Sequence, residues 1–445
     1  MPGLAGRAFA APADGKGEVF KLREVSVFEQ GADNFLRGQT GLCQDKPFAE
    51  VRRYPACVSK KPLYGSVRFA PDYGQTNGGM LFYFAMDESQ GTGKGYDRLY
   101  FDLNRDLDLS NDPVVMPQRH PPGRASLGYS SIKKQVIFDL LTINFDFGPA
   151  GTRPVQIMPR LAVSVYEKEE YKQVSFVRTR LYAGDIKLGG KPHEARLGND
   201  YIIYGRLDLP GTALALAPRD SDDQPYEWLG GDRLRSAQKV HGRFVMFSAS
   251  PTGEELRVHP YQGDLGTFEI GPGGRAIDKL SVAGSLEAKE LAVAVGGDFE
   301  NGSPKPARRC QIPVGDYSPN YITVDFGRLR IAISHNYHSE GKPRDRIGRA
   351  SVYGLTVRRD KPYVLDFSNK PDVMFASPAR DQRFKPGDTV EVKAVLVDPK
   401  LDFMIRRLND TTRTESGGGN LSLDPKVLIT RANGEKVAEG VMPFG

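Results

Sequence analysis

Apolar and polar residues alternate with a period of two along most of the chain. The alternation recurs in short runs rich in Val, Ile, Phe and Tyr, among them Val19–Leu22, Met80–Phe84, Val136–Leu140, Ile322–Phe326 and Val390–Val395. Gly, Pro, Asn or Asp bound these runs, which predicts strands joined by turns. Helical periodicity is confined to two short segments, 284–291 and 403–408. The pattern predicts an all-β protein, built as several β-sandwich or barrel domains with few short helices.

The length of 445 residues is enough for two to four domains, each with its own core. We expect an N-terminal extension and irregular segment over residues 1–60, and a β-domain with an acidic, calcium-like loop over 61–185. A second β-rich domain is expected over 186–370, and a sandwich module over 371–445. No stretch has the about 18 consecutive apolar residues that a membrane-spanning helix needs, so we expect no membrane span.

An acidic stretch between residues 102 and 112 carries the strongest chemical signal. Every second position holds an oxygen-bearing side chain, in the order Asp102, Asn104, Asp106, Asp108, Ser110 and Asp112. Carboxylates this close repel one another unless a cation lies among them, and Arg105 is the only basic residue within the stretch. We therefore predict calcium bound through Asp102, Asn104 and Asp106, with Asp108 or Asp112 completing the shell. The alternatives are a turn whose acids face water, or a strand with one polar face.

The spacing of Asp102, Asn104 and Asp106 resembles the first half of the calcium loops of EF-hand and dockerin-like modules. Those loops have glycine at position six and an acidic residue at position twelve, where this chain has Leu107 and Pro113. The preceding residues 98–101 read as a strand and not as a helix. The stretch is thus similar to the Asp-rich, helix-free loops of secreted bacterial β-proteins, which implies a compartment rich in calcium.

The C-terminal segment carries a second resemblance. Pro371–Pro378, followed by Phe384–Ala394 and Asp398, resembles the first two strands of bacterial immunoglobulin-like or fibronectin-like modules. The resemblance implies a separate sandwich, in which Glu391 and Lys393 face water. Its core would take Val373, Phe375, Val390, Val392, Ala394 and Val427. Such modules are usually spacers or adhesive units.

Two further features bear on the setting. Cys43 and Cys57 could close a small disulfide loop, or all three cysteines, including Cys310, could be unlinked thiols. Residues Ala8–Pro12 resemble the small-residue end of a secretory signal, although no positive and apolar regions precede them. Together with the acidic loop, they lead us to expect a secreted, periplasmic or cell-surface protein.

The net charge of +6 is concentrated in one segment. Lys305–Lys361 holds twelve Lys and Arg against five Asp and Glu. An anionic partner, such as an acidic glycan, a lipid head group or nucleic acid, would be drawn there. The alternation of Arg328 and Arg330 on a strand-like run favours an ordinary solvated sheet face instead.

Catalytic motifs are few. The Ser-x-x-Lys sequence at Ser130–Lys133 precedes a strand, whereas penicillin-recognising enzymes place this motif at the start of a helix. His335 and His338 could supply two ligands to zinc, but a catalytic site needs a third.

We therefore expect a non-catalytic exported β-protein with a structural, assembly or adhesion role, stabilised by calcium. Its partner would be a second copy of itself or a cell-surface polymer. The alternative is an exported hydrolase or glycan-binding protein with its site between β-domains.

Overall fold

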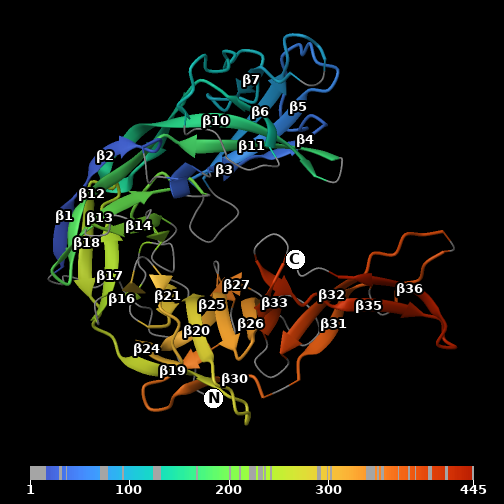
Figure 1. Cartoon of the computed structure of the whole chain (residues 1–445). Coiled ribbons are helices and arrows are strands. Elements are labelled where there is room, and N and C mark those ends of the chain that lie inside the picture. The colour runs from blue at the N-terminus through green and yellow to red at the C-terminus, as the bar shows by residue number, and fades with distance from the viewer. Residues whose placement is uncertain are drawn as a thin grey trace, which may run out of the picture.

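The computed structural model confirms the all-β prediction and the presence of several packed sheets. Figure 1 shows these sheets following one another along an open arc. The structure describes residues 17–29, 33–36, 38–70, 79–92, 95–123, 132–166, 169–199, 202–209, 212–219, 227–228, 234, 237–240, 243–287, 292–297, 299–300, 303–336, 346–347, 350–351, 355–368, 370–378, 381–385, 387–398, 403–415 and 419–442.

Helical structure within these ranges is limited to short 3-10 turns such as η1 (Asp33–Leu36) and η3 (Gly148–Ala150). None of them reaches seven residues, and none could cross a membrane. The helical interpretation of 284–291 and 403–408 is wrong for the described residues, since 284–287 and 403–408 lie in strands. Both strands pair with neighbours on two sides, and this pairing outweighs the local pattern.

The largest sheet has 13 strands. From edge to edge, its main path runs through β1 (Glu18–Lys21), β18 (Glu255–Pro260), β17 (Arg243–Ala249), β16 (Ala237–Val240), β21 (Ala292–Val295), β20 (Leu280–Glu287), β25 (Gly315–Phe326), β26 (Leu329–Asn336), β33 (Phe403–Thr414), β32 (Lys393–Asp398) and β31 (Asp372–Ser377). Two more strands attach to this path, β29 (Leu355–Val357) to β25 and β34 (Asn420–Ser422) to β33.

Four smaller sheets carry most of the remaining strands. One contains β4 (Leu42–Gln44), β5 (Leu63–Phe69), β6 (Met80–Asp87) and β7 (Arg98–Phe101). A second contains β3 (Gln39–Thr40), β11 (Glu169–Arg178), β10 (Thr152–Tyr166), β8 (Ile132–Ile137) and β9 (Leu141–Asp146). A third contains β15 (Glu227–Trp228), β14 (Ala213–Pro218), β13 (Lys191–Gly198), β12 (Arg180–Leu188) and β2 (Arg23–Ser26). The fourth contains β24 (Arg309–Pro313), β19 (Leu265–Gly271) and β30 (Tyr363–Asp366).

Three two-stranded ribbons complete the described elements: β22 (Phe299–Glu300) with β23 (Ser303–Pro304), β27 (Arg346–Ile347) with β28 (Ala350–Ser351), and β35 (Lys426–Thr430) with β36 (Lys436–Val441).

The N-terminal segment 18–44 contributes one strand to each of four sheets. In chain order, β1 pairs with β18, β2 with β12, β3 with β11 and β4 with β5, all antiparallel. This part of the expected irregular region 1–60 is therefore regular. The expected boundaries at 185/186 and 370/371 also do not separate sheets, because β12 runs across the first and β33 pairs with β26 across the second.

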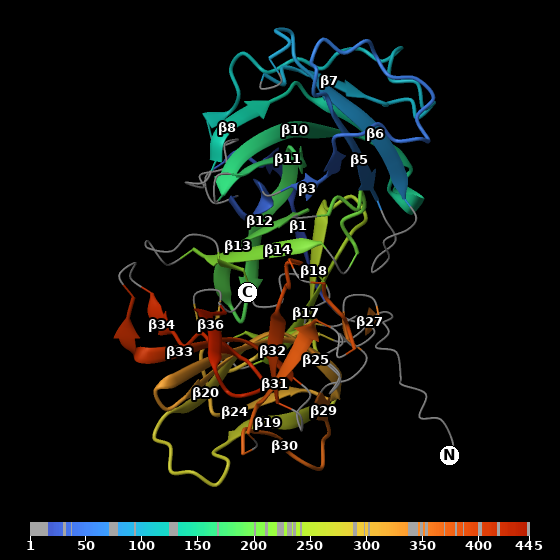
Figure 2. The same cartoon turned by 90° about the vertical axis from the view of Figure 1, so that its right-hand side faces the viewer.

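The sheet of β4–β7 packs against the sheet of β3 and β8–β11 as a sandwich (Figure 2). At its centre the Phe176 ring lies 5.5–5.7 Å, centroid to centroid, from those of Phe69, Phe84 and Phe101. Strand β6 is buried on both faces, since Phe84 joins this core while Tyr83 joins a second cluster on the outer face. The acidic loop lies over that outer face.

The C-terminal strands do not form the expected core. Val373 and Phe375 are 56% and 64% exposed and Val390 is also exposed, so their predicted burial is wrong. Strand β31 is the outermost strand of the large sheet, and the face that carries Val373 and Phe375 is exposed. Val392, Ala394 and Val427 are half-buried, and Glu391 and Lys393 are exposed as expected.

Gly65 on β5 tests the packing of the sandwich. A Cβ atom at this position would lie 2.0 Å from Cζ of the buried Phe84 ring. Substituting Gly65→Ala should therefore cost about 1–3 kcal/mol in the free energy of unfolding. Denaturant unfolding measures this, with Gly440→Ala on β36 as the control, because its Cβ would meet nothing within 4 Å. Equal losses in both variants would contradict the packing described.

Candidate functional site

The acidic loop begins where the aromatic core ends. Phe101, the last residue of β7, is buried in the sandwich, and Asp102 follows it at 1% exposure. The backbone N–H of Asp102 donates to the Tyr83 carbonyl at 3.0 Å. Further along, Leu109 is fully buried against the outer face of β6, and its N–H donates to the Arg53 carbonyl at 2.9 Å. The loop is therefore held against the sheet at both ends.

Successive Asx turns account for the two-residue period of the loop. Asn104 Oδ1 accepts the backbone N–H of Asp106 at 2.9 Å, and Asp106 Oδ1 accepts that of Asp108 at 2.8 Å. Asp108 Oδ1 then accepts the N–H of Ser110 at 3.0 Å. Such bonds from a side chain to the backbone two residues on are a local alternative to regular structure. They give part of the side-chain oxygens of the loop hydrogen-bond donors without any cation.

Leu107 occupies the position at which EF-hand loops have glycine. Its φ is +66°, in the left-handed region that side-chain-bearing residues rarely adopt. Its N–H donates to Asp102 Oδ2 at 3.2 Å, which ties the middle of the loop to its buried start. The backbone thus makes the sharp turn of a calcium loop without the glycine.

Two carboxylate oxygens in the loop have no hydrogen-bond partner in the part of the chain that the structure describes. Asp102 Oδ1 and Asp112 Oδ2 are both buried and make no hydrogen bond. Burial raises the pKa of Asp102, and it raises the pKa of Asp112 to about 6, with repulsion from the other loop acids adding to the shift. Asp106 differs, because a hydrogen bond from the Asn111 side chain lowers its pKa. Loss of a proton is therefore disfavoured at the two ends of the loop, and it is favoured in its middle at Asp106.

The predicted ligands consequently fall into two groups. Asp102 and Asp112 each have a buried oxygen that makes no hydrogen bond with a described residue. Oxygens of Asn104, Asp106 and Asp108 are engaged in the turns. Across the residues that the structure describes, no three His, Cys, Asp or Glu side chains are grouped around a possible metal position. Calcium takes six to eight oxygens, so an ion at this loop would need the carboxylates of Asp102 and Asp112 together with oxygens that are now engaged in the turns.

Two arginines lie close to the loop, and one of them comes from a distant part of the sequence. Arg53 Nη1 lies 3.5 Å from Asp108 Oδ2, although it is distant in sequence. Arg105, inside the loop, instead lies with its guanidinium carbon 5.7 Å from the centre of the Phe82 ring. The basic compensation of the loop is thus partial: Arg53 pairs with Asp108, and the charge of Arg52 helps to lower the pKa of Asp106.

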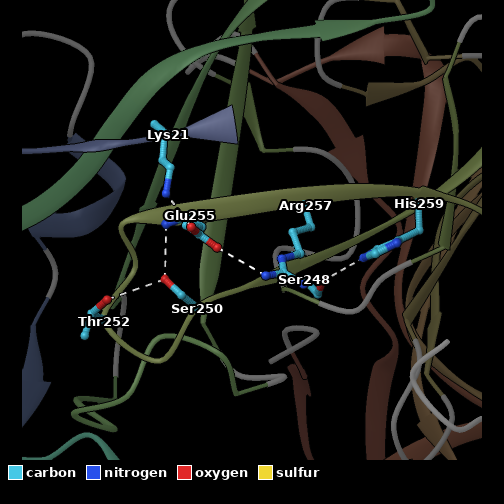
Figure 3. A network of polar contacts seen from close by, with 7 residues as sticks. All are labelled: Lys21, Ser248, Ser250, Thr252, Glu255, Arg257 and His259. Carbon is cyan, nitrogen blue, oxygen red and sulfur yellow. Dashed lines mark hydrogen bonds and ion pairs between the residues drawn. The ribbon is translucent and has the colours of Figure 1, made fainter. Parts of the chain in front are cut away.

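A serine–histidine contact on β17 and β18 was not predicted (Figure 3). Ser248 Oγ lies 2.9 Å from His259 Nε2, the spacing of a nucleophile and its base. Burial and Arg257 lower the pKa of His259, which keeps the ring neutral at pH 7. Its Nδ1 is buried and has no hydrogen-bond partner among the described residues, and a Cβ atom on Gly17 would lie 2.4 Å from it.

A catalytic triad needs a third group on that nitrogen. The neighbouring contacts in Figure 3 are ion pairs of Glu255 with Lys21 and Arg257 and hydroxyl contacts in the adjoining turn. The contact is therefore part of a polar cross-strand network.

The remaining sequence candidates add little chemistry. Cys43, Cys57 and Cys310 are free thiols, and burial raises the pKa of each to about 11, which disfavours the reactive thiolate. Ser130, His338 and the side chain of His335 lie outside the described residues.

Four arginines of the basic segment 305–361 are in ion pairs where the structure describes it. Ion pairs join Arg309 to Glu269, Arg330 to Asp325, Arg358 to Asp316 and Arg359 to Asp264. Such pairing is typical of a solvated sheet face.

Comparison with known proteins finds no matching family model, no similar curated protein and no similar solved structure.

Asp112 gives a pH-dependent prediction for the metal-free protein. Its pKa is about 6 in the folded state against 3.8 for a free side chain, so the folded state retains a proton that the unfolded chain releases. Stability should therefore fall as the pH rises from about 4 to 6. In chelator, Asp112→Asn should remove that part of the fall and be more stable than the parent at pH 7. Denaturant unfolding at each pH measures this.

Asp139→Asn, at an exposed acid outside the loop, is the matched control and should leave the pH profile unchanged. A parent and an Asp112→Asn variant with parallel pH profiles would show that Asp112 titrates normally.

Proposed function

We propose that the chain is a non-catalytic, exported β-protein with a structural, assembly or adhesion role, stabilised by calcium in the loop 102–112. One observation carries the proposal: Asp102 Oδ1 and Asp112 Oδ2 are buried carboxylate oxygens that no described residue hydrogen-bonds. An unpaired buried charge is costly, and a hard divalent cation with oxygen ligands relieves that cost.

Calcium would act as a clamp on the sandwich. The loop covers the outer face of β6 through the buried side chain of Leu109. Neutralising Asp102 and Asp112 would keep that cover closed above the pH at which Asp112, with its pKa of about 6, loses its proton. A ligand at 100 times its Kd stabilises the folded state by about 2.7 kcal/mol. Loops of extracellular modules bind calcium with a Kd of about 0.1–1 mM, which agrees with an exported setting.

The C-terminal end of the large sheet supports the assembly role. Strand β31 lies at the sheet edge with Val373 and Phe375 exposed. The ribbon of β35 and β36 exposes Leu428, Val437 and Val441. Open sheet edges and contiguous apolar surface are features through which β-proteins associate.

Removal of calcium tests the proposal. Calcium should raise the melting temperature of the purified chain at pH 7, and a chelator should reverse the rise. Asp102→Asn should abolish the response, because it removes the buried charge that attracts the ion while keeping the shape of the side chain. Differential scanning calorimetry with and without calcium measures both effects.

Asp45→Asn changes an exposed acid that directly follows β4 in the same sandwich, and this variant should respond to calcium like the parent. Identical melting curves of the parent in calcium and in chelator would refute calcium stabilisation. An Asp102→Asn variant that still responds would place the ion elsewhere.

A further inference from the structure

A second site lies where three sheets meet, away from the acidic loop. It is a pocket of about 640 Å³, within the range of about 300–1,000 Å³ typical of small-molecule sites. Glu24 on β2, Arg153 on β10 and Arg180 on β12 contribute to its wall, together with Arg178 at the end of β11 and Glu254 in the turn before β18. The pocket thus depends on the N-terminal segment as well as on both long strands of the sandwich.

Arg178 is a buried cation without a carboxylate partner. Its side chain is 6% exposed, and Nη1 donates to Asn199 Oδ1 at 3.2 Å and to the Gly205 carbonyl at 3.1 Å. Its Nε is buried and makes no hydrogen bond, and the Phe147 ring centre lies 6.0 Å from the guanidinium carbon. Within the described ranges no acidic oxygen lies within 4 Å of it. A buried charge of this kind is stable when an ion of opposite charge pairs with it.

The other charges of the pocket leave a positive balance. Arg153 is paired with Glu254, whose Oε1 lies 3.1 Å from Arg153 Nη1. Arg180 is exposed, and its side chain makes no ion pair or hydrogen bond with other described residues. Two arginines therefore face the single remaining acid, Glu24.

We propose that this pocket binds a small molecule of monosaccharide size that carries one oxyanion group, a carboxylate, sulfate ester or phosphate ester. The planar guanidinium groups of Arg178 and Arg180 pair with the oxyanion, since their parallel N–H groups match its oxygens. The neutral part of the ligand lies against Tyr182, Thr252 and the apolar Pro154, which share the pocket wall. The site shares no residue with the loop 102–112.

Calorimetric titration of the full chain tests the proposal, with glucuronate, glucose 6-sulfate and glucose 6-phosphate as probes and glucose as the neutral control. We expect saturable binding of at least one anion at millimolar concentration and none of glucose. The preferred probe identifies the oxyanion. Arg180→Gln should weaken binding about tenfold or more by removing a charge-assisted pair. Glu24→Gln should tighten it, because a like charge is removed from the pocket.

Arg243→Gln, at an exposed arginine on β17 outside the pocket, is the matched control and should bind like the parent. Arg180 carries the test because its side chain is exposed, whereas a variant of the buried Arg178 can also disturb the fold. Absence of binding of all three anions by the folded parent would overturn the proposal. So would equal binding of glucose, unchanged affinity in Arg180→Gln, or weaker binding in Glu24→Gln.

Discussion

Backbone pairing of the N-terminal segment is the constraint on which the architecture depends. Four short strands, β1 to β4, each add to a different sheet, so about 27 residues connect structures that later parts of the chain build. Between β1 and β2 the Leu22 N–H donates to the Glu254 carbonyl at 2.8 Å. That bond places Leu22 and Glu24 in the wall of the arginine pocket. Fold and candidate ligand site are thus set by the same segment.

The acidic loop is a local structure, in contrast to the N-terminal segment. Packing of the core beside it buries carboxylate oxygens that have no hydrogen-bond partner among the described residues. The Phe101 ring packs against Phe176 in the core. Asp102 is the next residue along the chain and is therefore buried too. The Asx turns satisfy the middle of the loop, but they cannot reach Asp102 Oδ1 or Asp112 Oδ2. A folded protein tolerates such a pair when a proton or a cation neutralises it. At neutral pH, calcium is the neutralising ion in our account.

Local patterns predicted the strands well, and long-range pairing explains what they missed. Period-two runs depend on neighbouring residues only, so the all-β class could be predicted from them. The exposure of Val373 and Phe375 could not be predicted from such runs, because it depends on where their strand lies in the large sheet and on what packs against it. The five acidic-loop residues were predicted as calcium ligands from spacing alone. The same spacing also fits Asx turns, and only burial separates Asp102 and Asp112 from the rest. The Ser248–His259 contact follows from the register of β17 and β18. The sequence held one indication of Arg178 and Arg180: two arginines occupy alternate positions beside an apolar run.

A crystal structure in calcium, with anomalous diffraction recorded to locate the ion, tests the central claim most directly. The account predicts an anomalous peak between Asp102 Oδ1 and Asp112 Oδ2, with calcium–oxygen distances of about 2.3–2.6 Å. At least one Asx-turn bond of Asp106 or Asp108 should be replaced by a bond to the ion. A loop that keeps all of its Asx turns at saturating calcium, with no peak beside Asp102 Oδ1 or Asp112 Oδ2, would contradict the account.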